Sequence, residues 1–192
     1  MSGQWSGPGA ARRARGWHRL DERWAARVVE AACVRPGELV LDLGAGTGAL
    51  TAPLVAAGAR VLAVELHPGR AQRLRRRFAD DAVTVIETDL ADLRLPPRPF
   101  RVVANPPFGI TSAILRQLLS ARSRMTAADL VLQRAVANRY ASGAAPGAGR
   151  WLRRYDAELG LRVPRAAFGP PPRVDAAVLR LRAPSKYGSR TS

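Results

Sequence analysis

Apolar and polar positions divide the chain into short buried strands that alternate with amphipathic helices. Apolar runs that end at turn residues predict strands at 39–44, 60–66, 82–89, 100–109 and 127–133. Apolar residues at helical spacing predict helices at 21–34, 48–57, 68–78, 110–119 and 134–158, the last interrupted at 143–149. Two more strands, 161–168 and 173–183, are predicted on either side of a proline-rich turn.

This alternation of strand and helix is typical of an α/β domain with a doubly wound, mostly parallel sheet of seven strands. The last two strands are close in sequence, so we expect them to add an antiparallel hairpin at the edge. Residues 1–16 contain Gly, Ser, Ala and Arg with little apolar content, which predicts a flexible basic arm. The predicted domain covers 17–183, and 184–192 form a short tail.

The charge of the chain favours a polyanionic partner. Lysine and arginine total 31 against 15 acidic residues, a formal net charge of +16, and Lys186 is the single lysine. A GC-rich genome would explain arginine in place of lysine, but it would not explain a twofold excess of base over acid. No apolar run approaches the ~20 residues of a membrane span. With one cysteine the chain cannot form an internal disulfide, and one cysteine and two histidines argue against a zinc site. We expect a cytoplasmic protein without metal or membrane contact. We also expect it to be a monomer.

A glycine-rich loop follows the first predicted strand of the sheet. Its sequence is Asp42-Leu43-Gly44-Ala45-Gly46-Thr47-Gly48, and alternate glycines let the backbone approach a ligand closely. A dinucleotide-binding fingerprint is the alternative, but it needs its third glycine one residue later. The Asp42 carboxylate would repel a phosphate and attract a cation. This favours S-adenosylmethionine, which carries a sulfonium and an ammonium group.

Two further acids end the second and third predicted strands. Glu65 would accept hydrogen bonds from ribose hydroxyls, and Asp89 would accept one from an adenine amino group. The carboxyl ends of parallel strands share one edge of a sheet, so these acids would lie on the same rim as Asp42. The alternative interpretation is that all three are ordinary acids that cap the following helices.

The fourth strand ends in the turn Asn105-Pro106-Pro107-Phe108. Two prolines make the turn rigid and remove two backbone donors, so the Asn105 side-chain oxygen and the Pro106 carbonyl would be left as acceptors. Two acceptors suit an exocyclic base amine, and Phe108 offers a stacking face for a base pulled out of its helix. Alternatively, this is a strand-ending turn with a core phenylalanine.

Together these motifs resemble a known family. The loop at 42–48, Glu65, Asp89 and the turn at 105–108 resemble the Rossmann-like class I S-adenosylmethionine-dependent methyltransferases that modify adenine N6. The segment VPRAAFGPPPRVDAAVL at 163–179 resembles the signature of the rRNA adenine N6-methyltransferases, which include the Erm macrolide-resistance and KsgA-type enzymes. RGWHRLDERWAARVV at 15–29 is most similar to the short Erm proteins of mycobacteria and related actinobacteria.

The resemblance implies roles for particular residues. Asn105, Pro106 and Phe108 would be catalytic, and Phe108 and Phe168 would hold the flipped adenine, although Phe168 could also be a core aromatic. The implied cofactor-binding residues are His18, Leu20, Asp42, Gly44, Ala45, Gly46, Glu65, Leu66, Asp89, Leu90 and Asn105.

The chain also departs from the family pattern. His18 stands where the family usually has a cofactor-binding asparagine, and Ala176 replaces the usual serine. Typical members continue into a small helical domain that helps bind RNA, whereas this sequence ends soon after its last predicted strand. We therefore expect arginines to hold the RNA instead, namely Arg12, Arg13, Arg15, Arg134, Arg139, Arg153 and Arg154.

The function that follows from the resemblance is N6-methylation of an adenine in 23S rRNA, which would give macrolide, lincosamide and streptogramin B resistance. The first alternative is adenine dimethylation of small-subunit rRNA, as in the KsgA-type enzymes. The second is a non-catalytic RNA-binding protein on a methyltransferase fold. The intact glycine loop and the intact turn at 105–108 argue against a loss of chemistry.

Overall fold

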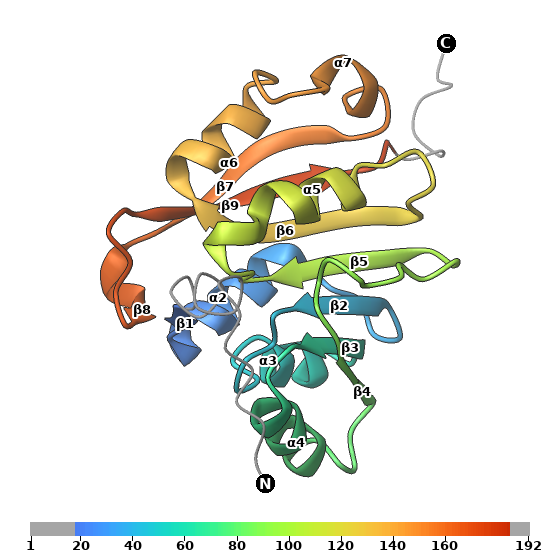
Figure 1. The fold of residues 1–192 in the computed structure, drawn as a ribbon, viewed down its shortest axis with the longest axis vertical. Coiled ribbons are helices and arrows are strands. Elements are labelled where there is room, and N and C mark those ends of the chain that lie inside the picture. Colours follow the sequence, from blue (N-terminus) through green and yellow to red (C-terminus); the bar gives the residue numbers. More distant parts are fainter. Residues whose placement is uncertain (1–17, 185–192) are drawn as a thin grey trace, which may run out of the picture.

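A seven-stranded mixed sheet forms the centre of the computed structural model, which describes residues 18–184 (Figure 1). The strand order is β4-β3-β2-β5-β6-β9-β7. The strands are β2 Leu39–Leu43, β3 Arg60–Glu65, β4 Val83–Glu87, β5 Phe100–Ala104, β6 Met125–Gln133, β7 Asp156–Val163 and β9 Ala176–Arg182. The pairs from β4 to β6 are parallel, whereas β9 runs antiparallel to both β6 and β7. The predicted mostly parallel α/β sheet, with its antiparallel hairpin at one edge, is confirmed.

Helices cover both faces of this sheet. Helices α2 Glu22–Ala32, α3 Thr51–Ala56 and α4 Pro68–Arg77 contribute to one hydrophobic core, and α5 Thr111–Leu118, α6 Arg134–Ala141 and α7 Ala148–Trp151 to the other. Strand β6 serves both cores, because Leu130 and Leu132 pack into one and Val131 into the other. Its residues are therefore buried on both sides, which explains the continuous apolar run in the sequence.

The sequence-based boundaries are wrong in the last third of the domain. Helix α6 ends at Ala141, next to the predicted interruption, but the helix expected to continue from there to residue 158 is wrong: α7 ends at Trp151, and the chain is already in β7 at Asp156. Gly143 and Gly147 adopt left-handed φ values of 73° and 74°, so the helix cannot pass through them. The strand expected at 161–168 ends at Val163, because Pro164 has no N–H for the ladder.

A second, two-stranded sheet joins segments from opposite ends of the chain. Strand β1, Arg19–Leu20, pairs antiparallel with β8, Phe168–Gly169, which follows a short 3-10 turn at Arg165–Ala167. The pair lies beyond the carboxyl ends of the parallel strands, on the left of Figure 1. It therefore brings Phe168 to the edge of the sheet where a ligand is expected.

Candidate active site

The glycine-rich loop adopts a conformation that requires glycine. Gly44, Gly46 and Gly48 have φ values of 80°, 60° and 89°. A Cβ on Gly44 would stand 3.1 Å from Cδ of Pro107, and one on Gly48 would stand 2.7 Å from the Phe78 ring. The loop is therefore packed directly against the 105–108 turn on one side and against the end of α4 on the other.

Glu65 holds this loop to the end of β3. Its side chain is 3 % exposed, and Oε2 accepts a 2.9 Å hydrogen bond from the Gly46 N–H. Oε1 accepts from the His67 N–H at 2.8 Å and forms an ion pair with Arg70 at 2.9 Å. An ionised carboxylate has about four acceptor sites, so Oε2 keeps capacity for a ligand hydroxyl.

Asp42 is buried at the end of β2, with 1 % of its side chain exposed. Its Oδ2 accepts a 2.7 Å hydrogen bond from the Thr51 hydroxyl, a neutral donor. Burial raises the pKa of Asp42 to about 7, and the nearby negative charge of Glu65 adds to the rise. A cationic ligand beside Asp42 would reverse this effect, so the carboxyl group fits the sulfonium and ammonium groups of S-adenosylmethionine.

A small pocket brings together many of the residues that the sequence predicted to bind a cofactor. Its lining comprises Arg19, Leu20, Asp42, Gly44, Ala45, Gly46, Thr47, Ala49, Leu50 and Asn105. Five of the predicted cofactor residues are not among these lining residues: His18, Glu65, Leu66, Asp89 and Leu90. Leu66 is 46 % exposed and Leu90 is buried, and the ribose contact of Glu65 stays a prediction. Asp89 Oδ1 accepts a 3.0 Å hydrogen bond from the Ala91 N–H, as a turn-capping acid does. The adenine contact of Asp89 and the cofactor contacts of Leu66 and Leu90 stay predictions.

The 105–108 turn is fixed by a contact with the N-terminal segment of the domain. Asn105 Nδ2 donates a 2.8 Å hydrogen bond to the backbone carbonyl of His18. The His18 ring in turn hydrogen-bonds through Nδ1 to the Pro170 carbonyl at 2.8 Å. His18 thus links Asn105 to the proline-rich loop after β8, and its predicted cofactor contact stays a prediction.

Three aromatic rings lie next to one another beside this turn. The Phe108 ring centre is 5.6 Å from that of His18 and 6.4 Å from that of Phe168, the latter in an edge-to-face arrangement. Phe168 is buried, whereas Phe108 is only half-buried. Arg165 fixes the loop that carries Phe168. Its side-chain Nε donates to the Pro172 carbonyl, and its backbone N–H donates to Asp175 Oδ1. The two phenylalanines predicted to hold the flipped base are therefore neighbours.

The arginines predicted to hold RNA lie in different settings. Arg134, Arg139 and Arg153 are exposed. Arg154 is half-buried, and its guanidinium donates to the Ser120 and Ser123 carbonyls, which ties the α7 end to the loop after α5. Its RNA contact, like those of the other three, stays a prediction. The remaining predicted arginines fall outside the described residues: Arg12, Arg13 and Arg15.

Sequence reasoning missed contacts at the site, including two that anchor Glu65 and Asn105. The first is the ion pair of Arg70 with Glu65, which the short spacing from the end of β3 to the first turn of α4 could have suggested. The second is the His18 carbonyl that anchors Asn105, for which no local signal exists because 87 residues separate the two.

Within residues 18–184, no group of three His, Cys, Asp or Glu side chains could hold a metal. Among the described helices, none has the length and apolar content to cross a bilayer.

The strand order, the glycine loop and the acids at the carboxyl edge define a Rossmann-like class I S-adenosylmethionine-dependent methyltransferase fold. Within that class, residues 19–187 match the family model described as ribosomal RNA adenine dimethylase, and the chain belongs to this family.

Relatives of known name fall into two groups. The chain is 39 % identical over 145 residues to an rRNA adenine N-6-methyltransferase of Corynebacterium diphtheriae, covering 74 % of this chain and 57 % of that protein. It is 39 % identical over 162 residues to the mycinamicin-resistance protein MyrB of Micromonospora griseorubida, covering 83 % and 51 %. It is 37 % identical over 174 residues to ribosomal RNA small subunit methyltransferase A of Leptothrix cholodnii, covering 84 % and 63 %. The chain thus spans between half and two-thirds of these relatives.

Among solved structures, the chain is similar to the 23S rRNA methyltransferase ErmE. The TM-score is 0.79 at 32 % identity, and the match covers 88 % of this chain and 70 % of ErmE. A dimethyladenosine transferase from Plasmodium falciparum gives a TM-score of 0.74 at 24 % identity, covering 86 % and 63 %, and shows the same fold.

Proposed function

We propose that the protein uses S-adenosylmethionine to methylate the N6 amine of an adenine in 23S rRNA, and that this modification gives macrolide, lincosamide and streptogramin B resistance. The observation that carries the proposal is the contact of Gly44 with Pro107. It sets the cofactor loop against the turn that would receive the base. Family membership and the two neighbouring phenylalanines support the same reaction.

The turn acts by position and by the direction of its acceptors. Because Asn105 Nδ2 donates to His18, the amide plane is fixed and Oδ1 is the group left to accept from a substrate. Together with the Pro106 carbonyl it would take both hydrogens of an exocyclic amine and direct the nitrogen lone pair toward the cofactor loop. When bound, S-adenosylmethionine supplies an electrophilic methyl group. Phe108 and Phe168 would hold the base in place, so catalysis comes from orientation rather than from an activated side chain.

The similarity to ErmE, named as a 23S rRNA methyltransferase, supports 23S rRNA as the substrate, and the similarity to MyrB, named as a mycinamicin-resistance protein, supports the resistance. A second candidate function is methylation of small-subunit rRNA. It is favoured by the match to ribosomal RNA small subunit methyltransferase A, which covers 84 % of this chain at 37 % identity.

Transfer of radiolabelled methyl groups to protein-free 23S and 16S RNA tests the proposal. Label in 23S RNA, at an adenine located by primer extension, supports it, and label confined to 16S RNA supports the second candidate. Label in neither RNA, from protein that binds S-adenosylmethionine, would contradict both functions and favour the non-catalytic alternative.

The role of the turn is tested with Asn105→Ala. Turnover should fall by more than tenfold, while affinity for S-adenosylmethionine stays within several-fold, because the lost acceptor matters most as the amine reacts. Asn138→Ala, at an exposed position on α6, is the matched control and should keep the wild-type rate. An Asn105→Ala protein with more than a tenth of the wild-type rate would show that Asn105 is not the amine acceptor.

A further inference from the structure

The face of the sheet covered by α5, α6 and α7 belongs to a stretch of sequence with almost no acidic residues. Between Asp92 and Asp156 the one acid is Asp129, against eleven arginines, one of which, Arg101, pairs with Asp129. The Asp129 carboxylate lies on the opposite side of the sheet, because its partners Arg101 and Arg180 also donate to the last carbonyls of α2. The α5–α7 side therefore has a concentrated positive charge.

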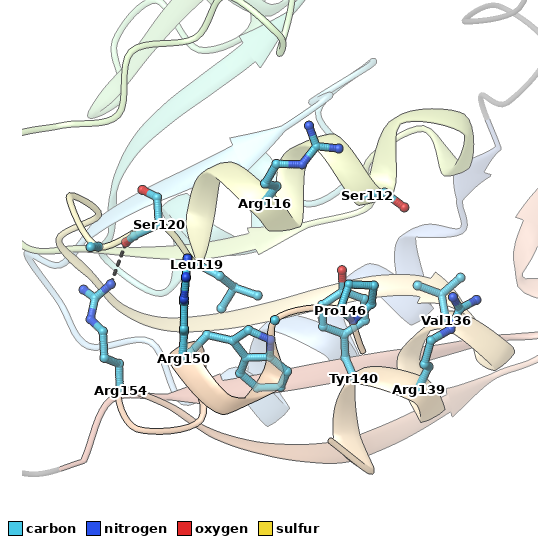
Figure 2. Close-up of a pocket in the computed structure, with 13 residues that line it drawn as sticks. Ser112, Arg116, Leu119, Ser120, Val136, Arg139, Tyr140, Pro146, Arg150 and Arg154 are labelled. Carbon is cyan, nitrogen blue, oxygen red and sulfur yellow. Dashed lines mark hydrogen bonds between the residues drawn. The ribbon is translucent and has the colours of Figure 1, made fainter. Parts of the chain in front are cut away.

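A cleft of about 510 Å³ opens on this side, between α5 and the α6–α7 segment (Figure 2). It is separate from the pocket of the glycine loop, and no residue lines both. The cleft has apolar walls with cations at its margins. It is lined by Ser112, Arg116, Leu119, Ser120, Ala121, Val136, Arg139, Tyr140, Pro146, Gly147, Arg150, Trp151 and Arg154.

The cations of the cleft come from both sides of it. Arg116 lies on α5, Arg139 on α6 and Arg150 on α7, and all three are exposed. The charges of Arg139 and Arg116 both reach the Tyr140 hydroxyl, whose pKa they lower against the larger effect of burial, which raises it. Figure 2 shows Arg150 extending toward Leu119 on the other side of the cleft. The fourth lining arginine, Arg154, already donates to backbone carbonyls. Three exposed guanidinium groups around a cleft without an acidic lining residue suit phosphate oxygens.

One wall of the cleft carries an unused hydrogen-bond donor. Trp151 is 4 % exposed and lines the cleft, and within the described part of the chain its indole N–H has no hydrogen-bond partner. A buried donor without a partner costs free energy, and a ligand acceptor that reached this N–H through a shift of the indole ring would remove that cost. Tyr140 packs on the same indole, with ring centres 5.8 Å apart, and adds an aromatic surface for a base.

We propose that this cleft binds a nucleotide of the RNA substrate next to the target adenine, with its phosphate held by Arg116, Arg139 and Arg150. This inference rests on the proposed function. Helix α5 starts at Thr111, after a 3-10 turn at Phe108–Ile110, and Arg116 is eight positions further along the chain than Phe108. At 1.5 Å per helical residue this is about 12 Å, a distance that a few nucleotides cover. A strand whose adenine lies beside Phe108 would therefore pass along the cleft.

A triple variant tests the three guanidinium groups. In R116Q/R139Q/R150Q, the affinity for a 23S RNA fragment should fall at least about tenfold, and the log–log salt slope should decrease by about two. The matched control is R60Q/R76Q/R98Q, which removes the same charge at exposed positions outside the cleft. It should change the affinity less than about threefold. Equal losses of RNA affinity in the two triple variants would overturn the proposal, because they would indicate that the overall positive charge of the protein attracts the RNA.

Trp151→Phe tests the unused donor separately, because it keeps an aromatic ring and removes the N–H. RNA affinity should fall several-fold with an unchanged salt slope, since no charge is lost, while the free protein melts at the same temperature or higher. Unchanged RNA affinity in both Trp151→Phe and the arginine triple variant would assign the cleft to another ligand and overturn the proposal.

Methyl transfer by the wild-type protein is measured alongside. Loss of RNA binding in the triple variant, with a wild-type protein that transfers no methyl group, would contradict the proposed function and leave the cleft as an RNA site. In another outcome, the wild-type protein transfers methyl groups and the triple variant binds and methylates RNA as well as the wild-type protein does. This would contradict the cleft proposal alone. Calorimetry with S-adenosylhomocysteine should give the same affinity for all variants, because none of the changed residues lines the glycine-loop pocket.

Discussion

Two aspartates are equally buried in the sheet, but their carboxylates have different partners. Asp42 on β2 and Asp129 on β6 are each 1 % exposed. Asp129 is 2.8 Å from the nearest guanidinium nitrogen of Arg182 and 3.5 Å from those of Arg101 and Arg180. Asp42 instead receives its side-chain hydrogen bond from the Thr51 hydroxyl. One carboxylate is neutralised by arginines of the protein itself, and the other is held by a neutral donor.

The pKa values follow this difference. Burial raises the pKa of Asp129, but the hydrogen bond and charge of Arg182 and the charges of Arg101 and Arg180 oppose the rise. Burial raises the pKa of Asp42 to about 7, and the charge of Glu65 raises it further, against the hydrogen bond of Thr51. A buried acid of perturbed pKa at the carboxyl edge of a parallel sheet is typical of a ligand site. The comparison therefore assigns a ligand-binding role to Asp42 and a structural role in the scaffold of the sheet to Asp129.

The largest effect should come from removing the scaffold carboxylate. Asp129→Ala leaves Arg101, Arg180 and Arg182 without their shared partner, and the first two also hold the end of α2. The free energy of unfolding should fall by about 3–5 kcal/mol, the usual cost of breaking a buried ion pair from one side. Urea denaturation at pH 7 measures this change. Arg101 and Arg180 also pair with Glu38 and Glu158. A loss below about 1 kcal/mol would show that these second partners are sufficient and that Asp129 is not central to the scaffold.

Asp42→Asn should have the opposite effect on the free protein. With a folded pKa of about 7 and a usual value of 3.8, Asp42 makes folding less favourable as pH rises between these values. At pH 8 the asparagine removes this cost, so stability should increase by about 2–4 kcal/mol, while affinity for S-adenosylmethionine falls. Urea denaturation at pH 8 and at pH 4 tests the sign, since the gain should vanish at pH 4. A variant that is less stable at pH 8 would mean that ionised Asp42 stabilises the fold.

The sequence predicted the site of Asp42 because the signals there are local. Asp42, Gly44 and Gly46 lie within one strand-to-helix turn, and the structure brings them to one pocket with Leu20 and Asn105. A loop that must approach a ligand closely needs glycine at fixed spacings. The binding motif therefore lies within a few adjacent residues and can be recognised from the sequence. The mostly parallel sheet followed from the same alternation of strand and helix.

The setting of Asp129 could not be predicted in the same way. It stands within the apolar segment AADLVLQ, and its partner Arg182 is 53 residues away on a strand whose register is set only by the folded sheet. The alternating arginines at 180 and 182 were the available signal. The pairing of β1 with β8 was also missed, because two-residue strands carry no periodicity.

The pH dependence of cofactor binding sharpens the comparison at a smaller scale. If ionised Asp42 attracts the cationic cofactor, affinity for S-adenosylmethionine should rise about tenfold from pH 6 to pH 8, because the ionised fraction rises through a pKa of about 7. The ratio of wild-type to Asp42→Asn affinity, measured by calorimetry, removes the titration of the ligand itself. Asp129 does not line the pocket, so it should not contribute to this dependence. A ratio that stays constant from pH 6 to pH 8 would contradict a role for the Asp42 charge.

The smallest effect should come from an ion pair that is open to solvent. Arg75 and Glu87 are 3.1 Å apart between α4 and β4, but their side chains are 47 % and 36 % exposed. Water and salt screen such a pair, so Glu87→Gln should change the free energy of unfolding by less than about 0.5 kcal/mol. The same urea experiment used for Asp129→Ala measures it, at low and high salt. A loss approaching that of Asp129→Ala would show that burial does not separate the two kinds of ion pair, and it would remove the physical basis for assigning Asp129 to the scaffold.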